Sequence, residues 1–374
     1  MSTAIQGLSL INGEAVRGQG PAFRAFDPGR GEALAPEFHA VSPAQVAQAC
    51  ELAGQAFDAF RATSDHERAD FLEQIAAQIL LLGDALIERA MAETGLPRAR
   101  LEGERGRTMG QLKLFAELLR EGSWQDARLD EALPQRQPLP RPDLRLRLIG
   151  VGPVAVFGAS NFPLAFSVAG GDSAAALAAG CPVVVKAHSA HPGTSELVGR
   201  AVVAALRHCG LPAGVFNLVM GRGSMVGEAL IESPDVAAIS FTGSVDTGRS
   251  IGAKCFAGMK KFQLEMGGKN PLVVLDDADL KTAIGCAVQG AYYSTGQRCT
   301  ASSRFIVTKG IHDRFVAGVT EELKGLVVDD ALKPGTQIGP VVDQKQLDQD
   351  MRYIEIGRGE GATLAWGGER LNRE

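Results

Sequence analysis

The sequence lacks the features of several large protein classes. Its six cysteines include no Cys-x-x-Cys pair, which argues against a zinc site and against a disulfide framework. The first residues have no basic stretch followed by an apolar one, so no secretory signal is expected. With a formal net charge of −5, the chain has no electrostatic reason to bind nucleic acid or an anionic membrane. Unpaired cysteines favour a reducing compartment, so we expect a cytoplasmic protein.

The sequence also lacks a continuous apolar run long enough to cross a membrane. Its most apolar stretch, residues 149–171, is interrupted by Pro153, Asn161 and Pro163 and contains several glycines. We therefore expect a buried strand that leads into a functional turn, and no membrane partner. No internal repeat or low-complexity segment is present in the sequence.

The residues that are present favour a globular α/β protein of more than one domain. The chain has 374 residues, more than one ordinary core holds, with 45% hydrophobic residues, 22% charged residues and 45 glycines. Helical periodicity begins after Ser42-Pro43 and continues to about residue 119, which predicts an N-terminal helical layer. From Val154 onward, short β-branched runs alternate with helical segments, which predicts a parallel sheet with helices on both faces.

Changes of pattern along the chain suggest the domain boundaries. Four prolines between Leu133 and Pro142 break the helical pattern, and a run of alternating leucine and arginine follows, typical of a strand with one wet face. A second α/β unit begins near Pro271. We predict a nucleotide-binding domain from residues 1–133 and 152–267, a linker and projecting strand at 134–151, and a second domain at 268–374.

Cys299 is a candidate nucleophile. It follows Gly296-Gln297-Arg298, so a glycine that permits close backbone approach and a fixed positive charge are its neighbours. A nearby positive charge favours the thiolate, which is the reactive form of a cysteine. Taken alone, however, a cysteine in such a protein is more often a small core residue.

Two further residues supply the groups that a thiol nucleophile needs. Glu265 stands at a predicted strand end before Gly267-Gly268 and is a candidate base to activate water, although an exposed glutamate before a turn explains it equally well. Asn161, in a turn after a buried strand, is a candidate donor to a developing oxyanion, although a plain asparagine turn is the commoner meaning.

Taken together and in this order, these motifs resemble the aldehyde dehydrogenase superfamily. The similarity extends through most of the chain and includes Asn161-Phe162-Pro163, Lys186 at a strand end, Phe241-Thr242-Gly243-Ser244, Glu265-Met266-Gly267-Gly268-Lys269 and Gly296-Gln297-Arg298-Cys299. The resemblance implies a Rossmann-like cofactor domain with an N-terminal helical layer and an α/β catalytic domain. It also implies that Cys299 attacks an aldehyde, that Asn161 and the Cys299 backbone N–H hold the oxyanion, and that Glu265 activates the water that releases the acid.

The cofactor site is inferred from the same resemblance. Family members bind the dinucleotide through residues corresponding to Gly243-Ser244 at a helix start, where free N–H groups favour phosphate, with Lys186 reaching the adenosine ribose. Gly223, within a run that departs by one residue from the G-x-G-x-x-G pattern, and Gly267 are further expected contacts. NAD-preferring relatives usually carry a glutamate where this chain has Ser189. Because a carboxylate would repel a 2′-phosphate, we expect NADP to be accepted alongside NAD, with Arg222 a second phosphate contact.

Two departures from the commonest family pattern point to a substrate. Ser160 replaces the tryptophan that many relatives have before the asparagine, and the run from Lys186 to Thr194 contains two histidines. Both features resemble the 2-oxoglutarate semialdehyde (2,5-dioxopentanoate) dehydrogenases of bacterial sugar-acid breakdown. Such a substrate carries a carboxylate, for which Arg105 and Arg107 are candidate partners, although a solvated helix face explains them too. His188 and His191 have no evident third ligand, so we expect loop residues and no metal site.

The family's pattern continues beyond the position of Glu374. We therefore expect the catalytic domain to be incomplete in this chain and the longer protein to be a homo-oligomer. Two alternatives remain open: a non-catalytic nucleotide-binding fragment, which large exposed apolar surface would favour, and a thiol esterase that uses the cysteine and the oxyanion site without a cofactor.

Overall fold

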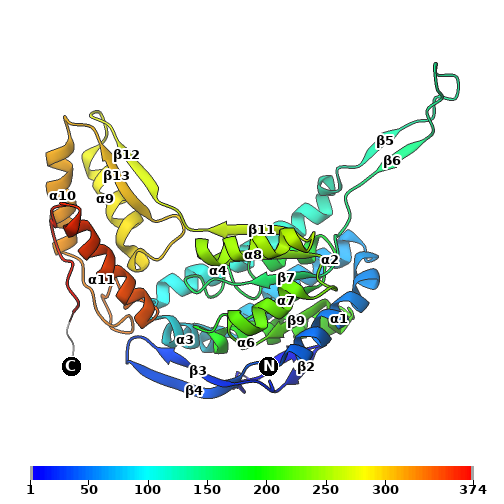
Figure 1. Ribbon diagram of the computed structural model, residues 1–374, viewed down its shortest axis with the longest axis horizontal. Helices are drawn as coiled ribbons and strands as arrows, with labels where there is room; N and C mark the ends of the chain where they lie inside the picture. Colours follow the sequence, from blue (N-terminus) through cyan, green and yellow to red (C-terminus); the bar gives the residue numbers. More distant parts are fainter. Residues whose placement is uncertain (1–2, 372–374) are drawn as a thin grey trace.

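The computed structural model describes residues 3–371 and is built around one seven-stranded sheet (Figure 1). Five of its strands are parallel, and β1 and β2 add an antiparallel edge. Across the sheet the strands are β11 (Lys261–Met266), β10 (Ala238–Gly243), β7 (Val154–Phe157), β8 (Val183–Lys186), β9 (Phe216–Val219), β1 (Ser9–Ile11) and β2 (Glu14–Val16). The predicted parallel sheet is therefore confirmed.

Both faces of this sheet are buried, as its continuous apolar strands require. In β7, Val154 and Val156 belong to one apolar core, whereas Ala155 and Phe157 belong to the other. Helices on both sides of the sheet complete these two cores. The first core is covered by α2 (Asp65–Leu81), α4 (Arg98–Glu121), α5 (Gly171–Ala178) and α6 (Pro192–His208), and the second by α1 (Pro43–Arg61), α7 (Glu228–Glu232) and α8 (Val245–Ala257).

The N-terminal helical layer begins as its capping residues predict. Ser42 accepts a hydrogen bond from the Gln45 backbone N–H, the Gln45 side chain accepts one from the Ser42 backbone N–H, and Pro43 occupies the first helical position. Ser64 and Glu67 form the same reciprocal pair at the start of α2. The layer also contains α3 (Gly83–Thr94), which ends at Gly95 in the left-handed conformation that glycine favours.

The order of the parallel strands creates the site for a ligand. From β7 the chain proceeds to β8 and β9 on one side and then crosses to β10 and β11 on the other. The connections after β7 and β10 therefore diverge to opposite faces at the carboxyl ends of adjacent strands, where open α/β sheets bind their ligands. Asn161 follows β7, and Ser244 follows β10.

A hairpin of β5 (Arg128–Asp130) and β6 (Leu144–Leu146) projects far from the body of the protein (Figure 1). Its leucines at 129, 144 and 146 are exposed. The predicted projecting strand is β6, and β5 is the second arm. The domain boundaries proposed from sequence stay a prediction.

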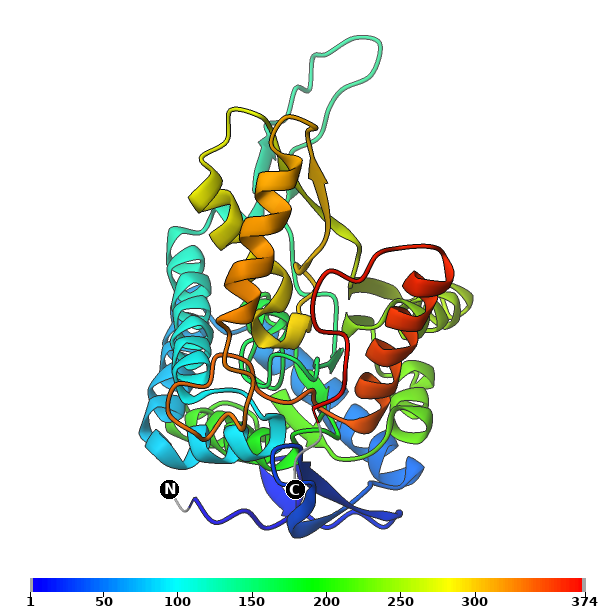
Figure 2. The same cartoon turned by 90° about the vertical axis from the view of Figure 1, so that its left-hand side faces the viewer.

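The second α/β unit lies at the opposite end of the protein from the hairpin tip (Figure 1) and faces the viewer in the turned view (Figure 2). Its parallel strands pack against α9 and α10 around a small apolar core that includes Val274, Val288 and Phe315. Its elements are β12 (Asn270–Val274), α9 (Leu280–Tyr292), β13 (Ser302–Val307), α10 (His312–Lys324) and α11 (Gln344–Gly359). Val273, Leu275 and Ile306 are 57%, 53% and 52% exposed, so apolar side chains of this unit face solvent.

The N-terminal strands were not predicted. Besides β1 and β2, the chain forms a hairpin of β3 (Ala22–Asp27) and β4 (Glu32–His39) before the first helix. Within residues 3–371, no helix is long and apolar enough to span a membrane.

Candidate active site

One cleft of about 1700 Å³ brings together side chains from both α/β units. Nine of the ten catalytic and cofactor residues proposed from sequence line it: the three catalytic candidates Asn161, Glu265 and Cys299, and the cofactor candidates Lys186, Ser189, Gly223, Gly243, Ser244 and Gly267. The tenth, Arg222, is exposed and does not line the cleft.

Cys299 is exposed at the cleft and lies on a loop held from two sides. The Asn161 side-chain amide donates to the Gln297 carbonyl oxygen at 2.7 Å, and the Asn270 amide donates to the Cys299 carbonyl oxygen at 2.7 Å. Just before the cysteine, Ser294 and Thr295 have φ angles of 56° and 56°, a left-handed conformation uncommon for residues other than glycine. The loop therefore keeps a conformation that local preference alone would not select.

Arg298 has a local role in that loop. Its guanidinium donates to the Ser294 hydroxyl at 3.0 and 3.2 Å, across the left-handed residues. Burial and the nearby positive charge of Arg100 lower the pKa of Arg298, which nonetheless remains charged near neutrality. The arginine thus supplies both a positive charge beside the cysteine and a brace for the loop.

Asn161 has the chemistry of an oxyanion donor. It follows β7, and its side-chain amide carries two N–H groups, of which one is bonded to the Gln297 oxygen. The second N–H of this amide makes no hydrogen bond within residues 3–371, so it can donate to the oxygen of a reacting carbonyl. The amide therefore joins the cysteine loop to the turn after β7.

Glu265 comes to the cleft on β11, where it pairs in register with Thr242 of β10. Its side chain is exposed and makes no hydrogen bond or ion pair within the described residues. An unpaired carboxylate in the same cleft as an exposed thiol is available to bind and deprotonate a water molecule.

The cleft also has groups suited to a dinucleotide. Lys186, at the end of β8, is buried, and burial lowers its pKa to about 8. Its ammonium donates to the Ala187 carbonyl oxygen at 3.0 Å and has no carboxylate partner in the described part of the chain. Ser244 precedes the first turn of α8, whose backbone N–H groups receive no side-chain cap. A buried, unpaired cation and an open helix start fit the sugar and phosphate groups of a nicotinamide dinucleotide.

His188 and Ser189 line the cleft next to Lys186. His188 is stacked on His191 with ring centroids 5.4 Å apart, and burial lowers the pKa of His188 well below its usual value. No group of three His, Cys, Asp or Glu side chains among residues 3–371 is arranged to hold a metal ion. Ser189 supplies no negative charge at this position.

Some cleft residues could not be inferred from sequence. The segment from Val342 to Asp350, at the start of α11, lines the cleft opposite the sheet, although the sequence shows only a polar stretch there. Asp172 of α5 also lines it and accepts hydrogen bonds from Ser240 and Thr242 of β10. No motif marks these residues, because their roles arise from tertiary contacts.

Comparison with known proteins identifies relatives of this arrangement. A model of the aldehyde dehydrogenase family matches residues 16–374. The chain is 48% identical over 367 residues to "Alpha-ketoglutaric semialdehyde dehydrogenase 2" of Azospirillum brasilense, covering 96% of this chain and 70% of that protein. It is 44% identical over 336 residues to "Alpha-ketoglutaric semialdehyde dehydrogenase" of Acinetobacter baylyi, covering 88% of this chain and 64% of that protein.

Solved structures share the fold. An Escherichia coli structure described as an NADP dependent enzyme superposes with a TM-score of 0.88 at 31% identity, covering 99% of this chain and 74% of that one. Betaine aldehyde dehydrogenase from Staphylococcus aureus, solved with NAD+, superposes with a TM-score of 0.89 at 26% identity, covering 99% of this chain and 71% of that one.

Proposed function

Because the chain belongs to the aldehyde dehydrogenase family, we propose that it oxidises 2-oxoglutarate semialdehyde to 2-oxoglutarate, with Cys299 as the nucleophile. One observation carries the assignment of the site: a thiol, a side-chain amide and an unpaired carboxylate from distant parts of the chain line the same cleft. The cofactor is a nicotinamide dinucleotide, and Lys186, Gly243 and Ser244 are proposed to hold it.

The residues act in sequence on the aldehyde carbonyl. The Cys299 sulfur forms a bond to the carbonyl carbon, and the oxygen that becomes negative is held by the Asn161 amide and the Cys299 backbone N–H. A bound nicotinamide supplies the acceptor for the hydride that leaves this carbon. The resulting thioester on Cys299 is then attacked by a water molecule whose proton passes to Glu265, which releases the acid and leaves Cys299 as the thiolate, ready for the next aldehyde.

The assay that tests this function follows reduced-cofactor absorbance with 2-oxoglutarate semialdehyde. Aldehyde-dependent reduction supports the dehydrogenase. Ester hydrolysis without cofactor reduction would favour a thiol esterase that uses the exposed thiol and Asn161. If the protein shows neither cofactor reduction nor ester hydrolysis, the result favours a non-catalytic nucleotide-binding fragment, in keeping with the exposed apolar side chains of β12 and β13.

The preference for a cofactor is proposed to depend on Ser189. We expect Ser189→Glu to lower kcat/KM for NADP relative to NAD by about 10-fold or more, because a carboxylate near the adenosine ribose repels a 2′-phosphate. Ser189→Ala is the matched control, since it removes the hydroxyl without adding charge, and its effect on the ratio should be several times smaller. Strict NAD dependence of the unsubstituted protein would contradict the proposal. Arg222, which lies outside the cleft, is no longer needed for it.

The substrate carboxylate is proposed to contact Arg107. Arg107 is exposed and does not itself line the cleft, but its guanidinium lies 4.9 Å from the Phe166 ring centroid and 5.9 Å from that of Phe162, and both of these residues line it. Arg105 instead donates to the Gly83 carbonyl oxygen. We expect Arg107→Gln to raise KM for 2-oxoglutarate semialdehyde about 10- to 100-fold, the loss of one charge-assisted contact, with no comparable change for pentanal.

Arg105→Gln is the control for that experiment, because it removes the same charge from the same helix, two residues away. Its KM values should change less than about threefold, as for other surface substitutions. Equal effects of the two variants, or an equal effect of Arg107→Gln on both aldehydes, would remove Arg107 from the substrate site.

Assembly and location are proposed on separate grounds. A two-stranded hairpin is marginally stable alone, so β5 and β6, with exposed leucines, are proposed to pack against a second copy in a homo-oligomer. All six cysteines are free thiols, which supports a reducing cytoplasm.

A further inference from the structure

The turn that carries Asn161 lies between two buried groups that the proposed chemistry does not use. The turn is closed by a hydrogen bond from the Ala159 N–H to the Phe166 oxygen at 2.8 Å. On the C-terminal side of Asn161, Glu104 Oε1 accepts hydrogen bonds from the Leu164 and Ala165 backbone N–H groups at 2.8 and 2.9 Å. On the N-terminal side, His191 Nε2 lies 3.0 Å from the Ala159 carbonyl oxygen. Asn161 therefore sits between two points of attachment.

Glu104 holds the backbone just after Asn161, and the positive charge of Arg100 compensates the negative charge of its carboxylate. It is 2% exposed on α4, and its second carboxylate oxygen lies 2.5 Å from Arg100 Nη1. The same Arg100 guanidinium stands 4.6 Å from the ring centroid of Phe162, the residue that follows Asn161. Without this acceptor, two buried backbone N–H groups would have no hydrogen-bond partner, which is unfavourable, so Glu104 holds the segment in place.

His191 holds the backbone just before Asn161. Its ring is fully buried, and burial lowers its pKa, so it is neutral near pH 7 and carries one N–H. A carbonyl oxygen can only accept, so the hydrogen bond to Ala159 places that proton on Nε2. The His191 ring also stacks on the ring of His188, which lines the cleft.

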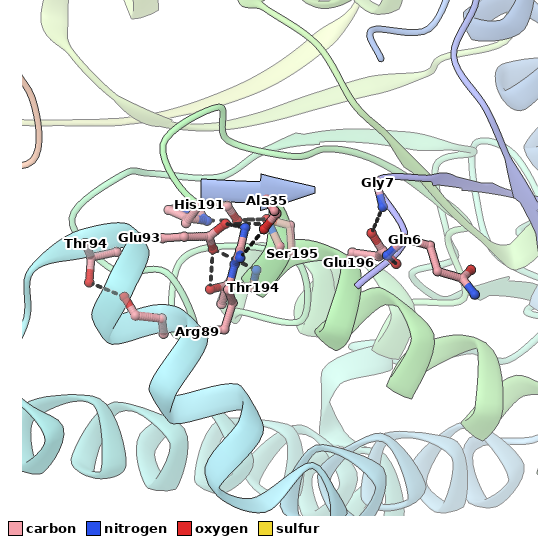
Figure 3. Close-up of polar contacts among 12 residues, drawn as sticks. Gln6, Gly7, Ala35, Arg89, Glu93, Thr94, His191, Thr194, Ser195 and Glu196 are labelled. Atoms are coloured by element: carbon pink, nitrogen blue, oxygen red, sulfur yellow. Dashed lines mark hydrogen bonds and ion pairs between the residues drawn. The ribbon is translucent and has the colours of Figure 1, made fainter. Parts of the chain in front are cut away.

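The position of His191 is itself fixed by the helical layer. Glu93 of α3 is fully buried and accepts hydrogen bonds from the Gly193 and Thr194 backbone N–H groups, both at 2.8 Å, and from the Thr194 hydroxyl at 2.7 Å (Figure 3). These groups form the first turn of α6, directly after His191. Arg89 pairs with Glu93 at 2.9 Å, and a side chain at Gly193 would collide with the Arg89 guanidinium.

We propose that Glu104 and His191 are positioning residues that clamp the Asn161 turn from its two flanks and thereby aim the amide at the oxyanion. This inference rests on the proposed function, because it assigns a purpose to the amide that the function requires. Neither residue touches substrate or cofactor. Their effect passes through the backbone on either side of Asn161.

The clamp has a kinetic signature that distinguishes it from general support of the fold. Misplacing a catalytic group by about 1 Å costs about 100-fold in rate. Loss of either attachment should therefore lower the rate of the first turnover and leave the alkylation rate of the Cys299 thiol near its original value. The Kd for cofactor should also be unchanged in the Glu104 variant, because Glu104 lies on α4, whereas His191 shares a loop with Lys186 and Ser189.

The experiment is a double-mutant cycle with Asn161→Ala in the full protein, with stopped-flow detection of the first turnover. We expect Glu104→Met and His191→Leu each to slow that turnover about 10- to 100-fold. When Asn161→Ala is already present, each of these substitutions should lower the rate by less than about a further threefold, because the Asn161 amide that Glu104 and His191 position has been removed. Glu104→Gln and His191→Gln keep an acceptor and a donor, so they should restore most of the rate.

Each other result has a definite meaning. If Asn161→Ala alone leaves the first turnover unchanged, the oxyanion role in the proposed function is wrong. If Asn161→Ala slows it but the second substitution is fully additive, the clamp is wrong and the function stands. A loss of cofactor affinity in Glu104→Met, or of thiol alkylation in either variant, that matches the loss of rate would also overturn the clamp. If Glu104→Met does not fold, the His191→Leu cycle decides the question by itself.

Discussion

Replacing Cys299 with alanine is expected to lower aldehyde-dependent cofactor reduction by at least about 1000-fold, because no other group can form the covalent bond to the carbonyl carbon. The measurement is the initial rate of reduced-cofactor formation with 2-oxoglutarate semialdehyde. Binding of the reduced cofactor, followed by its fluorescence, should stay within about threefold of the original, since Cys299 is not among the residues proposed to hold the cofactor.

Cys286 provides the matched control for this prediction. It is the other cysteine that is exposed, and it lies on α9, outside the cleft. Cys286→Ala should retain nearly full activity, and iodoacetamide should inactivate that variant as fast as the original protein. A Cys299→Ala protein that keeps a tenth of the activity, or a Cys286→Ala protein that loses it, would show that the nucleophile has been misassigned.

The fold could be predicted from sequence where local pattern and tertiary structure agree. The pattern of strands predicted to start at Val154 begins there, with β7, because a short apolar run before a glycine turn has few other solutions. Ser42-Pro43 predicted the start of α1, since the cap and the fixed φ of proline act within one turn of helix. The aldehyde dehydrogenase fold, inferred from the order of motifs, is confirmed by solved structures that superpose over nearly the whole chain.

The contacts that organise the site could not be predicted in the same way. Glu104 resembles any glutamate on a charged helix, and only the tertiary structure shows that it is buried and bonded to residues 60 positions away. His191 lies in the loop before α6, as its Pro-Gly context predicts, but only the tertiary structure shows that it bonds to Ala159, 32 positions earlier in the chain. Long-range hydrogen bonds of this kind leave no periodic signal in one sequence. The assignments of Cys299, Glu265 and Asn161 remain predictions that the shared cleft supports.

Replacing Glu265 with glutamine is expected to separate the two halves of the reaction. The first turnover, which needs the thiol and the oxyanion donor, should proceed near its original rate and give a burst of reduced cofactor equal to the enzyme concentration. Later turnovers should slow by about 100- to 1000-fold, because an amide cannot take the proton from the water that hydrolyses the thioester. Stopped-flow absorbance measures both phases.

Mass spectrometry of the stalled Glu265→Gln enzyme provides an independent check. The acyl group should be found on the peptide that contains Cys299, and it should be absent when the aldehyde is omitted. Glu228→Gln is the control, because Glu228 also lines the cleft but is paired with Lys254 at 2.9 Å. That variant should show the original steady-state rate. If Glu265→Gln instead lowers the burst and the steady state equally, the carboxylate acts before the thioester forms, and its role as the hydrolytic base is wrong.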